Sequence, residues 1–261
     1  MPMRDTPTRE TLWALKNATP QHTLLTEVGL PVDEARNALA KRILEYDSEE
    51  FVAWIDDDAC WMPGSIEELV SNLTALPDCS LVCGSFSERR PYGNAIAGGF
   101  GRVLQPGPPG QAGCNVFFGQ VVPIEHCGFH FLVMRTAALR TLGPKPFDTL
   151  GLRGEDYSFC HRLVSQGGKL ACNPAVAAAH IEVKNGLAFL PGHPPFKIEG
   201  GRARALKPQD VGALQGVAPV GRVKNPDGTR ALRIEMKTQQ VRSYGTAVDA
   251  AKLLAEKANA A

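Results

Sequence analysis

The segment FVAWIDDD, residues 51–58, decides how this chain can fold, because five apolar residues lead directly into three carboxylates. A continuous apolar run with β-branched and aromatic side chains is typical of a strand covered on both faces of a parallel sheet. In open α/β sheets, ligands bind at the carboxyl ends of the strands. The segment therefore predicts a buried strand that ends in an acidic binding site.

Three adjacent carboxylates suggest a bound cation. If the chain stays extended, Asp56 and Asp58 point to one side and Asp57 points to the other. Two like charges about 4 Å apart repel by roughly 4 kcal/mol at an effective dielectric of 20, and a divalent cation removes that repulsion. Oxygen ligands alone favour Mg²⁺ or Mn²⁺ over zinc. The alternative is a solvated acidic turn before the next helix.

The residues on either side of this segment predict an alternation of helices and strands. Ser65 and Glu68 fit a capping box for a helix that follows the acidic segment, and Asp33 is a candidate cap for an earlier helix. Strands are expected at 23–28 and 80–86. This order predicts an α/β fold with a mostly parallel sheet flanked by helices.

Composition divides the chain into two parts. Residues 1–186 are expected to form the α/β domain, and residues 187–261 an appendage richer in Gly, Pro, Lys and Arg. Within the appendage, the turn signal at 225–228 predicts a hairpin, and a helix is expected at about 247–258.

Charge and hydropathy exclude several classes of protein. The 28 Lys and Arg residues balance 27 Asp and Glu, so no strong net field selects a nucleic acid or a membrane surface. No apolar run approaches the roughly 18 residues of a membrane span. Residues 1–5 lack the apolar core of a signal peptide, so we expect a cytoplasmic location. The seven cysteines show no CxxC spacing and are expected to be reduced, buried thiols.

A second acidic pair precedes another expected helix. Glu155 and Asp156 follow Gly154, and the helix after them is expected to stop at Gly167. Acids at a helix start also complement the helix dipole, which is the simpler explanation for the pair alone. His180 then follows a run of small residues at the end of an expected strand.

Taken in this order, the motifs resemble those of the GT-A glycosyltransferases, in particular the family 2-like branch, over roughly residues 6–186. Residues 56–58 resemble the DxD motif, whose acids hold the metal and the ribose of a nucleotide-sugar. Residues 154–156 resemble the Gly-Glu-Asp segment that supplies the catalytic base. Residues 35–37 resemble the family's ARN segment, and 128–131 the strand that walls the acceptor pocket.

The resemblance implies a metal-dependent transfer of a sugar from a nucleotide-sugar donor to an acceptor hydroxyl, with inversion if Asp156 is the base. The implied metal, Mn²⁺ or Mg²⁺, has Asp58 as a direct ligand, His180 as a further ligand, and Asp56 on the ribose or on a metal-bound water. Asp57 and Arg36 are assigned to the nucleotide side, with a mainly structural role as the alternative for Asp57.

The resemblance also implies roles for the second acidic pair, and composition suggests one for a long loop. Asp156 is the candidate base, and Glu155 orients the acceptor or caps the helix. The loop at 87–113, which carries Arg89, Arg90 and Arg102, is expected to be either a lid over bound donor or a disordered insertion. The donor sugar, the acceptor and the oligomeric state cannot be inferred from the sequence.

The sequence departs from the family pattern at its first strand, and two alternative functions remain. Residues 1–5 are too short and polar for the apolar first strand of the family, although 6–9 resemble the turn that follows it. A nucleotidyltransferase has the same acidic metal site, but no Gly-rich phosphate loop is found near the N-terminus. An inactive nucleotide- or sugar-binding relic is the non-enzymatic alternative.

Overall fold

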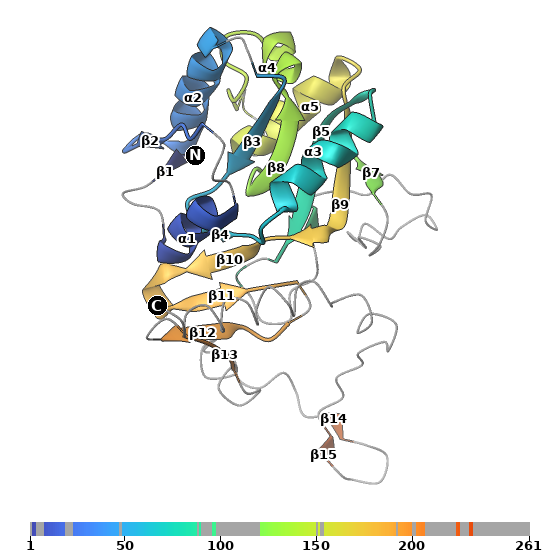
Figure 1. Cartoon of the computed structure of the whole chain (residues 1–261). Coiled ribbons are helices and arrows are strands. Elements are labelled where there is room, and N and C mark those ends of the chain that lie inside the picture. Colours follow the sequence, from blue (N-terminus) through green and yellow to red (C-terminus); the bar gives the residue numbers. More distant parts are fainter. Residues whose placement is uncertain are drawn as a thin grey trace.

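The computed structural model of the chain describes residues 8–18, 23–46, 49–87, 89, 121–149, 151, 154–191, 193–199 and 202–206, and the backbone at 2–3, 96–97, 223–224 and 230–231 (Figure 1). Two sheets form its centre. The helices are α1 (Arg9–Ala18), α2 (Val32–Tyr46), α3 (Ser65–Ala75), α4 (Thr136–Leu142) and α5 (Gly154–Ser165), with a short 3₁₀ turn, η1, at Val183–Asn185.

The main sheet is mixed and has helices on both faces. Its strand order is β3 (Phe51–Ile55), β8 (Phe131–Arg135), β5 (Cys79–Phe86), β9 (Lys169–Ala177) and β7 (Val122–Ile124), with β6 (Ile96–Ala97) paired to β5. Strands β3, β5 and β9 run in one direction, while β8 lies antiparallel between β3 and β5. The α/β class with a helix-flanked sheet, expected from the sequence, is confirmed.

Alternation along the central strands distributes side chains between two apolar layers. In β8, Leu132 and Met134 pack into the layer beneath α2, α4 and α5, whereas Phe131 and Val133 pack into the layer beneath α1 and α3. The strand period of two produces this division. The first four residues of β8 are buried and apolar, as in a central strand of an α/β protein that is covered on both faces.

The second sheet is antiparallel and brings the end of β3 next to the C-terminal half of the chain. Its order is β13 (Arg202–Ala205), β12 (Phe196–Glu199), β11 (Leu187–Phe189), β10 (Ala179–Glu182) and β4 (Ala59–Cys60). Strand β10 pairs with β11 across Gly186, the position at which composition suggested a boundary. The division into 1–186 and 187–261 stays a prediction.

The first strand is reduced to a two-residue element outside the main sheet. Strand β1 (Pro2–Met3) pairs in parallel with β2 (Glu27–Val28), within the expected strand 23–28. At the other end of the chain, β14 (Val223–Lys224) pairs with β15 (Arg230–Ala231) across the predicted turn at 225–228. The expected helix at 247–258 lies outside the described residues, and so does most of the loop 87–113.

Two local expectations differ from the structure. Helix α3 begins at Ser65, but its N-cap is Gly64 in the left-handed region and no side chain caps it. Instead of closing a capping box, Glu68 accepts a hydrogen bond from Asn173 at 3.1 Å. An Asn-Pro pair such as that at 173–174 is typical of a turn, yet β9 continues through it as a bulge: Gly84 faces Asn173 and Ser85 faces Ala177. A Cβ on Gly84 would lie 2.5 Å from the carbonyl oxygen of Val176, so the bulge requires glycine there.

None of the helices in the described part of the chain combines the length and the apolar character of a membrane span.

Candidate functional site

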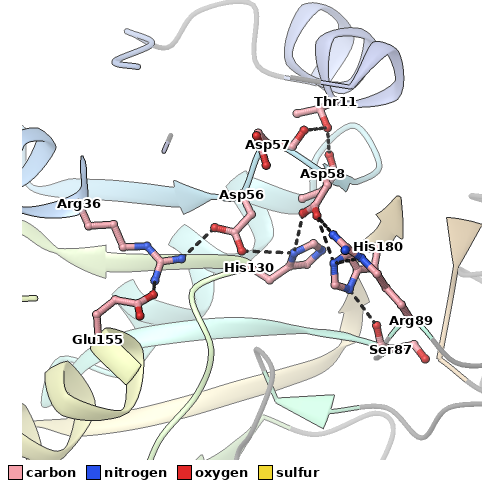
Figure 2. Close-up of polar contacts among 11 residues, drawn as sticks. Thr11, Arg36, Asp56, Asp57, Asp58, Ser87, Arg89, His130, Glu155 and His180 are labelled. Carbon is pink, nitrogen blue, oxygen red and sulfur yellow. Dashed lines mark hydrogen bonds and ion pairs between the residues drawn. The ribbon is translucent and has the colours of Figure 1, made fainter. Parts of the chain in front are cut away.

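Asp58 and His180 meet where the two sheets join. Asp58 lies in the turn between β3 and β4, and its carbonyl oxygen accepts a hydrogen bond from the backbone N–H of Ile181 at 2.8 Å. Next to this bond, His180 pairs with Ala59 across β10 and β4. The Nε2 atom of His180 consequently lies 3.3 Å from Oδ2 of Asp58 (Figure 2). Sequence reasoning named both residues, and the structure brings them together.

The second ring nitrogen of His180 fixes which atom faces the site. Nδ1 lies 3.4 Å from the carbonyl oxygen of Ser87, which can only accept a hydrogen bond. In the tautomer that donates from Nδ1 to this carbonyl oxygen, Nε2 presents its lone pair toward the site. Metal-binding histidines are commonly oriented in this way by a backbone carbonyl.

His130 is a third member of the group, which sequence reasoning placed in the acceptor-pocket wall at 128–131 and not at the metal. Its Nδ1 atom lies 3.6 Å from Oδ2 of Asp56 and 3.6 Å from Oδ1 of Asp58. The ring is 3% exposed and packs against Phe86 at 4.5 Å between centroids, and its buried Nε2 atom has no hydrogen-bond partner in the described part of the chain. The feature that could have indicated this position is the pairing of strands. The antiparallel β8 begins where β3 ends, and the carbonyl oxygen of His130 accepts a hydrogen bond from the N–H of Asp56 at 3.0 Å.

Asp58, His130 and His180 have the geometry of a metal-binding group. One ligand atom from each of the three lies within 4.8 Å of the others, close to the span that one ion bridges with bonds of about 2.1 Å. The Nε2 atom of His180, 3.3 Å from Oδ2 of Asp58, and the Nδ1 atom of His130, 3.6 Å from Oδ1 of Asp58, fit such a role. Two imidazoles with one carboxylate suit Mn²⁺ and other first-row metals better than Mg²⁺, which prefers oxygen alone.

Asp56 is directed away from His180 and toward a buried arginine. Oδ1 of Asp56 accepts a hydrogen bond from Arg36 at 2.9 Å, and the same guanidinium bonds Glu155 on α5 (Figure 2). Burial alone would raise the pKa of Asp56, but the Arg36 charge and the contact with His130 outweigh it and hold that pKa well below its usual range. Arg36 is 4% exposed and lies over the ring of Phe129. The structure thus joins the two acidic motifs through one side chain.

Asp156 differs from its neighbours because its carboxyl is partly buried and forms no ion pair with any residue that the structure describes. Burial, reinforced by the negative charge of Glu155, raises the pKa of Asp156 to about 6. Its Oδ1 atom accepts a hydrogen bond from the N–H of Tyr157 at the start of α5. A carboxylate with this pKa is a stronger base than an ordinary aspartate and is still ionised at neutral pH.

Asp57 attaches the acidic turn to helix α1. Its carbonyl oxygen accepts hydrogen bonds from the N–H of Thr8 at 3.0 Å and from the hydroxyl of Thr11 at 2.9 Å. The Thr11 hydroxyl also reaches the carbonyl oxygen of Ala59 at 2.8 Å. Helix α1, which the sequence analysis did not predict, therefore supports the backbone that carries the three aspartates.

Arg89 enters the group from the other side. Its guanidinium donates one hydrogen bond to Oδ2 of Asp58 and another, at 2.9 Å, to Nε2 of His180 (Figure 2). The sequence placed Arg89 in the expected lid at 87–113. Arg90 and Arg102 of that segment lie outside the described residues.

No protein-family model and no curated protein matches this sequence. By structure, the chain is similar to A197 from STIV, with a TM-score of 0.54 and 16% identity over 73% of this chain and 87% of that chain. Looser similarities are to GalNAc-T7 with UDP, GalNAc and Mn²⁺ (TM-score 0.40, 15% identity, 60% of this chain and 32% of that chain) and to apo UDP-glucose pyrophosphorylase (0.38, 8%, 63% and 60%). At such identities, what this chain shares with A197 is the fold alone.

Proposed function

We propose that this chain is a metal-dependent glycosyltransferase, which moves a sugar from a nucleotide-sugar donor to an acceptor hydroxyl. The observation that carries the proposal is the convergence of Asp58, His130 and His180 at the end of β3. The resemblance of residues 56–58 and 154–156 to the GT-A motifs supports it, because Arg36 links these two segments in space.

In this proposal, Asp58, His130 and His180 hold a Mn²⁺ ion. When bound, the ion stabilises the negative charge that develops on the departing diphosphate. Asp56 is paired with Arg36 yet 29% exposed, so one of its oxygens remains available to the ribose or to a metal-bound water. Asp57 acts chiefly through its backbone.

Asp156 is the proposed base that takes the proton from the acceptor hydroxyl. Its pKa of about 6 suits that task at neutral pH. Glu155 is held by Arg36 and therefore orients the start of α5, on which Asp156 lies. A single carboxylate acting on the attacking hydroxyl implies inversion at the sugar carbon.

The decisive experiment measures Mn²⁺ binding and turnover on a panel of nucleotide-sugars, with Asp58→Asn as the test variant. We expect this variant to lose Mn²⁺ affinity and turnover together while its fold remains intact. The matched control is Asp78→Asn, whose carboxylate forms a surface pair with Lys169 at 3.1 Å and should leave both unchanged.

The products distinguish the alternatives. Release of a nucleoside diphosphate with sugar transfer supports the glycosyltransferase, whereas formation of pyrophosphate from a nucleoside triphosphate and a sugar phosphate indicates a nucleotidyltransferase. Nucleotide binding without turnover of any donor would leave the inactive relic. Unchanged Mn²⁺ affinity in Asp58→Asn would contradict the metal site itself.

A further inference from the structure

Arg89 binds the same two atoms that a metal ion in this site needs. Its Nε donates to Nε2 of His180 at 2.9 Å, and its terminal nitrogen donates to Oδ2 of Asp58. We propose that Arg89 competes with the divalent cation for Asp58 and His180, so that the metal binds only when the guanidinium moves away. This inference rests on the metal site of the proposed function.

His180 makes the competition exclusive. A neutral imidazole has one lone pair, and the contact of Nδ1 with the carbonyl oxygen of Ser87 places that lone pair on Nε2. Nε2 can accept the hydrogen bond from Arg89 or bind a metal ion, but it cannot do both. Asp58 alone would permit coexistence, because its second oxygen, Oδ1, faces His130.

The two acceptor atoms also explain why a cation is needed between them. Nε2 of His180 and Oδ2 of Asp58 lie 3.3 Å apart and both carry lone pairs, so they repel unless a positive group bridges them. The guanidinium of Arg89 supplies that positive group, and a divalent ion would supply it with twice the charge. Two cations at the same position would repel each other, which adds to the exclusion at His180.

The position of Arg89 allows it to leave. Its side chain is 34% exposed, whereas that of Asp58 is 13% exposed and that of His180 is 18% exposed. A planar guanidinium also binds phosphate oxygens through paired hydrogen bonds. Once displaced, Arg89 is therefore available to the diphosphate of a donor beside the same site.

The experiment measures Mn²⁺ alone, by electron paramagnetic resonance of the free ion during titration of the full chain. We expect Arg89→Ala to bind Mn²⁺ about tenfold more tightly than the wild type, the factor for removing one competing charge-assisted hydrogen bond. Arg89→Lys should fall between the two, because an ammonium group keeps the charge without the fork.

Two further variants control for charge and folding. Arg202→Ala removes the same charge from exposed strand β13 and should leave the Kd of Mn²⁺ unchanged. Arg89→Gln removes the charge but keeps a polar side chain, and it should also bind Mn²⁺ more tightly if Arg89→Ala does not fold. Circular dichroism of each variant establishes that the fold is intact.

The outcomes separate this inference from the proposed function. Tighter Mn²⁺ binding in Arg89→Ala but not in Arg202→Ala supports the competition. Equal affinity in wild type and Arg89→Ala overturns it while the metal site stands, and weaker binding in Arg89→Ala also overturns it, because Arg89 then assists the metal. If neither protein binds Mn²⁺, both the metal site and the competition are wrong.

Discussion

Asp56 and Asp156 are aspartates whose pKa values the fold shifts in opposite directions. Burial by itself raises the pKa of both carboxyls. Arg36 lies directly against Asp56 and lowers its pKa, whereas it acts only at a distance on Asp156, which also has the negative Glu155 beside it. One carboxylate is thereby kept ionised under all ordinary conditions, and the other can exchange a proton near neutral pH. Such a pair of environments is common where acids have different catalytic roles.

The raised pKa of Asp156 predicts a particular pH dependence. If Asp156 is the base, kcat/KM should rise with pH through about 6, and Asp156→Asn should lower turnover by roughly 10²–10⁴. The free energy of unfolding should instead fall as pH rises through the same range. The folded state binds more protons than the unfolded state between about pH 4 and 6, so ionisation of Asp156 lowers the free energy of unfolding as pH rises.

Thermal denaturation of wild type and Asp156→Asn across that range checks the stability half of this prediction. The variant should be the more stable protein at pH 7, and the difference should disappear near pH 4. An equal pH profile for both proteins would show that Asp156 has an ordinary pKa. A larger loss of turnover in Glu155→Gln than in Asp156→Asn would exchange their proposed roles.

The sequence predicted Asp56, Asp58 and His180 at the metal site, but it placed His130 only in the segment 128–131 that resembles the acceptor-pocket wall. The aspartates stand out because three carboxylates after an apolar run cannot all be buried without a partner. His130 lies within an apolar stretch, where a single histidine carries no such signal. Its role depends on β8 lying next to β3, and that pairing joins residues that are far apart in the sequence.

Among the elements, α2, β3 and α5 meet at the guanidinium of Arg36. Arg36 lies on α2, its partner Asp56 follows β3, and its partner Glu155 begins α5. Because these elements come from three distant parts of the chain, one buried side chain fixes how they are placed. The sequence suggested Arg36 as a nucleotide contact, and that role stays a prediction.

Replacement of this arginine should therefore be costly for the fold. Arg36→Met leaves two carboxylates without their cation, and we expect a loss of about 3 kcal/mol in the free energy of unfolding, at the low end for a buried ion pair because Asp56 is 29% exposed. Urea denaturation measures this loss. The depressed pKa of Asp56 stabilises the fold above about pH 4, so the difference should shrink as pH falls below that value.

Arg42, on the same helix α2, provides a control for the Arg36→Met variant. Arg42 pairs with Glu27 at 3.6 Å on the surface, with 42% of its side chain exposed, so Arg42→Met should cost less than about 1 kcal/mol. If the two methionine variants were equally stable, Arg36 would have no special part in joining α2, β3 and α5.

The order of elements could be predicted more securely than their ends. Helices α2, α3 and α5 were each expected where the structure has them, because apolar periodicity and glycine stops are local signals. The cap of α3 and the bulge in β9 were missed because Asn173 bonds Glu68 and Asn72, both about a hundred residues earlier. Helix α1 was missed because its anchors are carbonyl oxygens of Asp57 and Ala59, which no sequence pattern reveals.

For the molecule as a whole, the candidate site is the seam between the two sheets. Asp58 leaves the main sheet and enters β4, His130 precedes β8, and His180 lies on β10 of the second sheet. A ligand that binds all three therefore connects two sheets that backbone hydrogen bonds join at the pairing of β4 with β10 and at the contact between Ala178 and Ser85.

This arrangement predicts how Mn²⁺ should change the whole molecule. At a concentration a hundred times its Kd, an ion that binds only the folded state raises the free energy of unfolding by about 2.7 kcal/mol. We expect hydrogen exchange to slow together at the C-terminal end of β3, at the N-terminal end of β8 and along β10, because each of these places lies next to or contains one of the three metal ligands. Asp58→Asn should lose all three effects at the same Mn²⁺ concentration. Protection confined to residues 56–58 would mean that the acids bind the ion alone, and that His130 and His180 serve only to orient them.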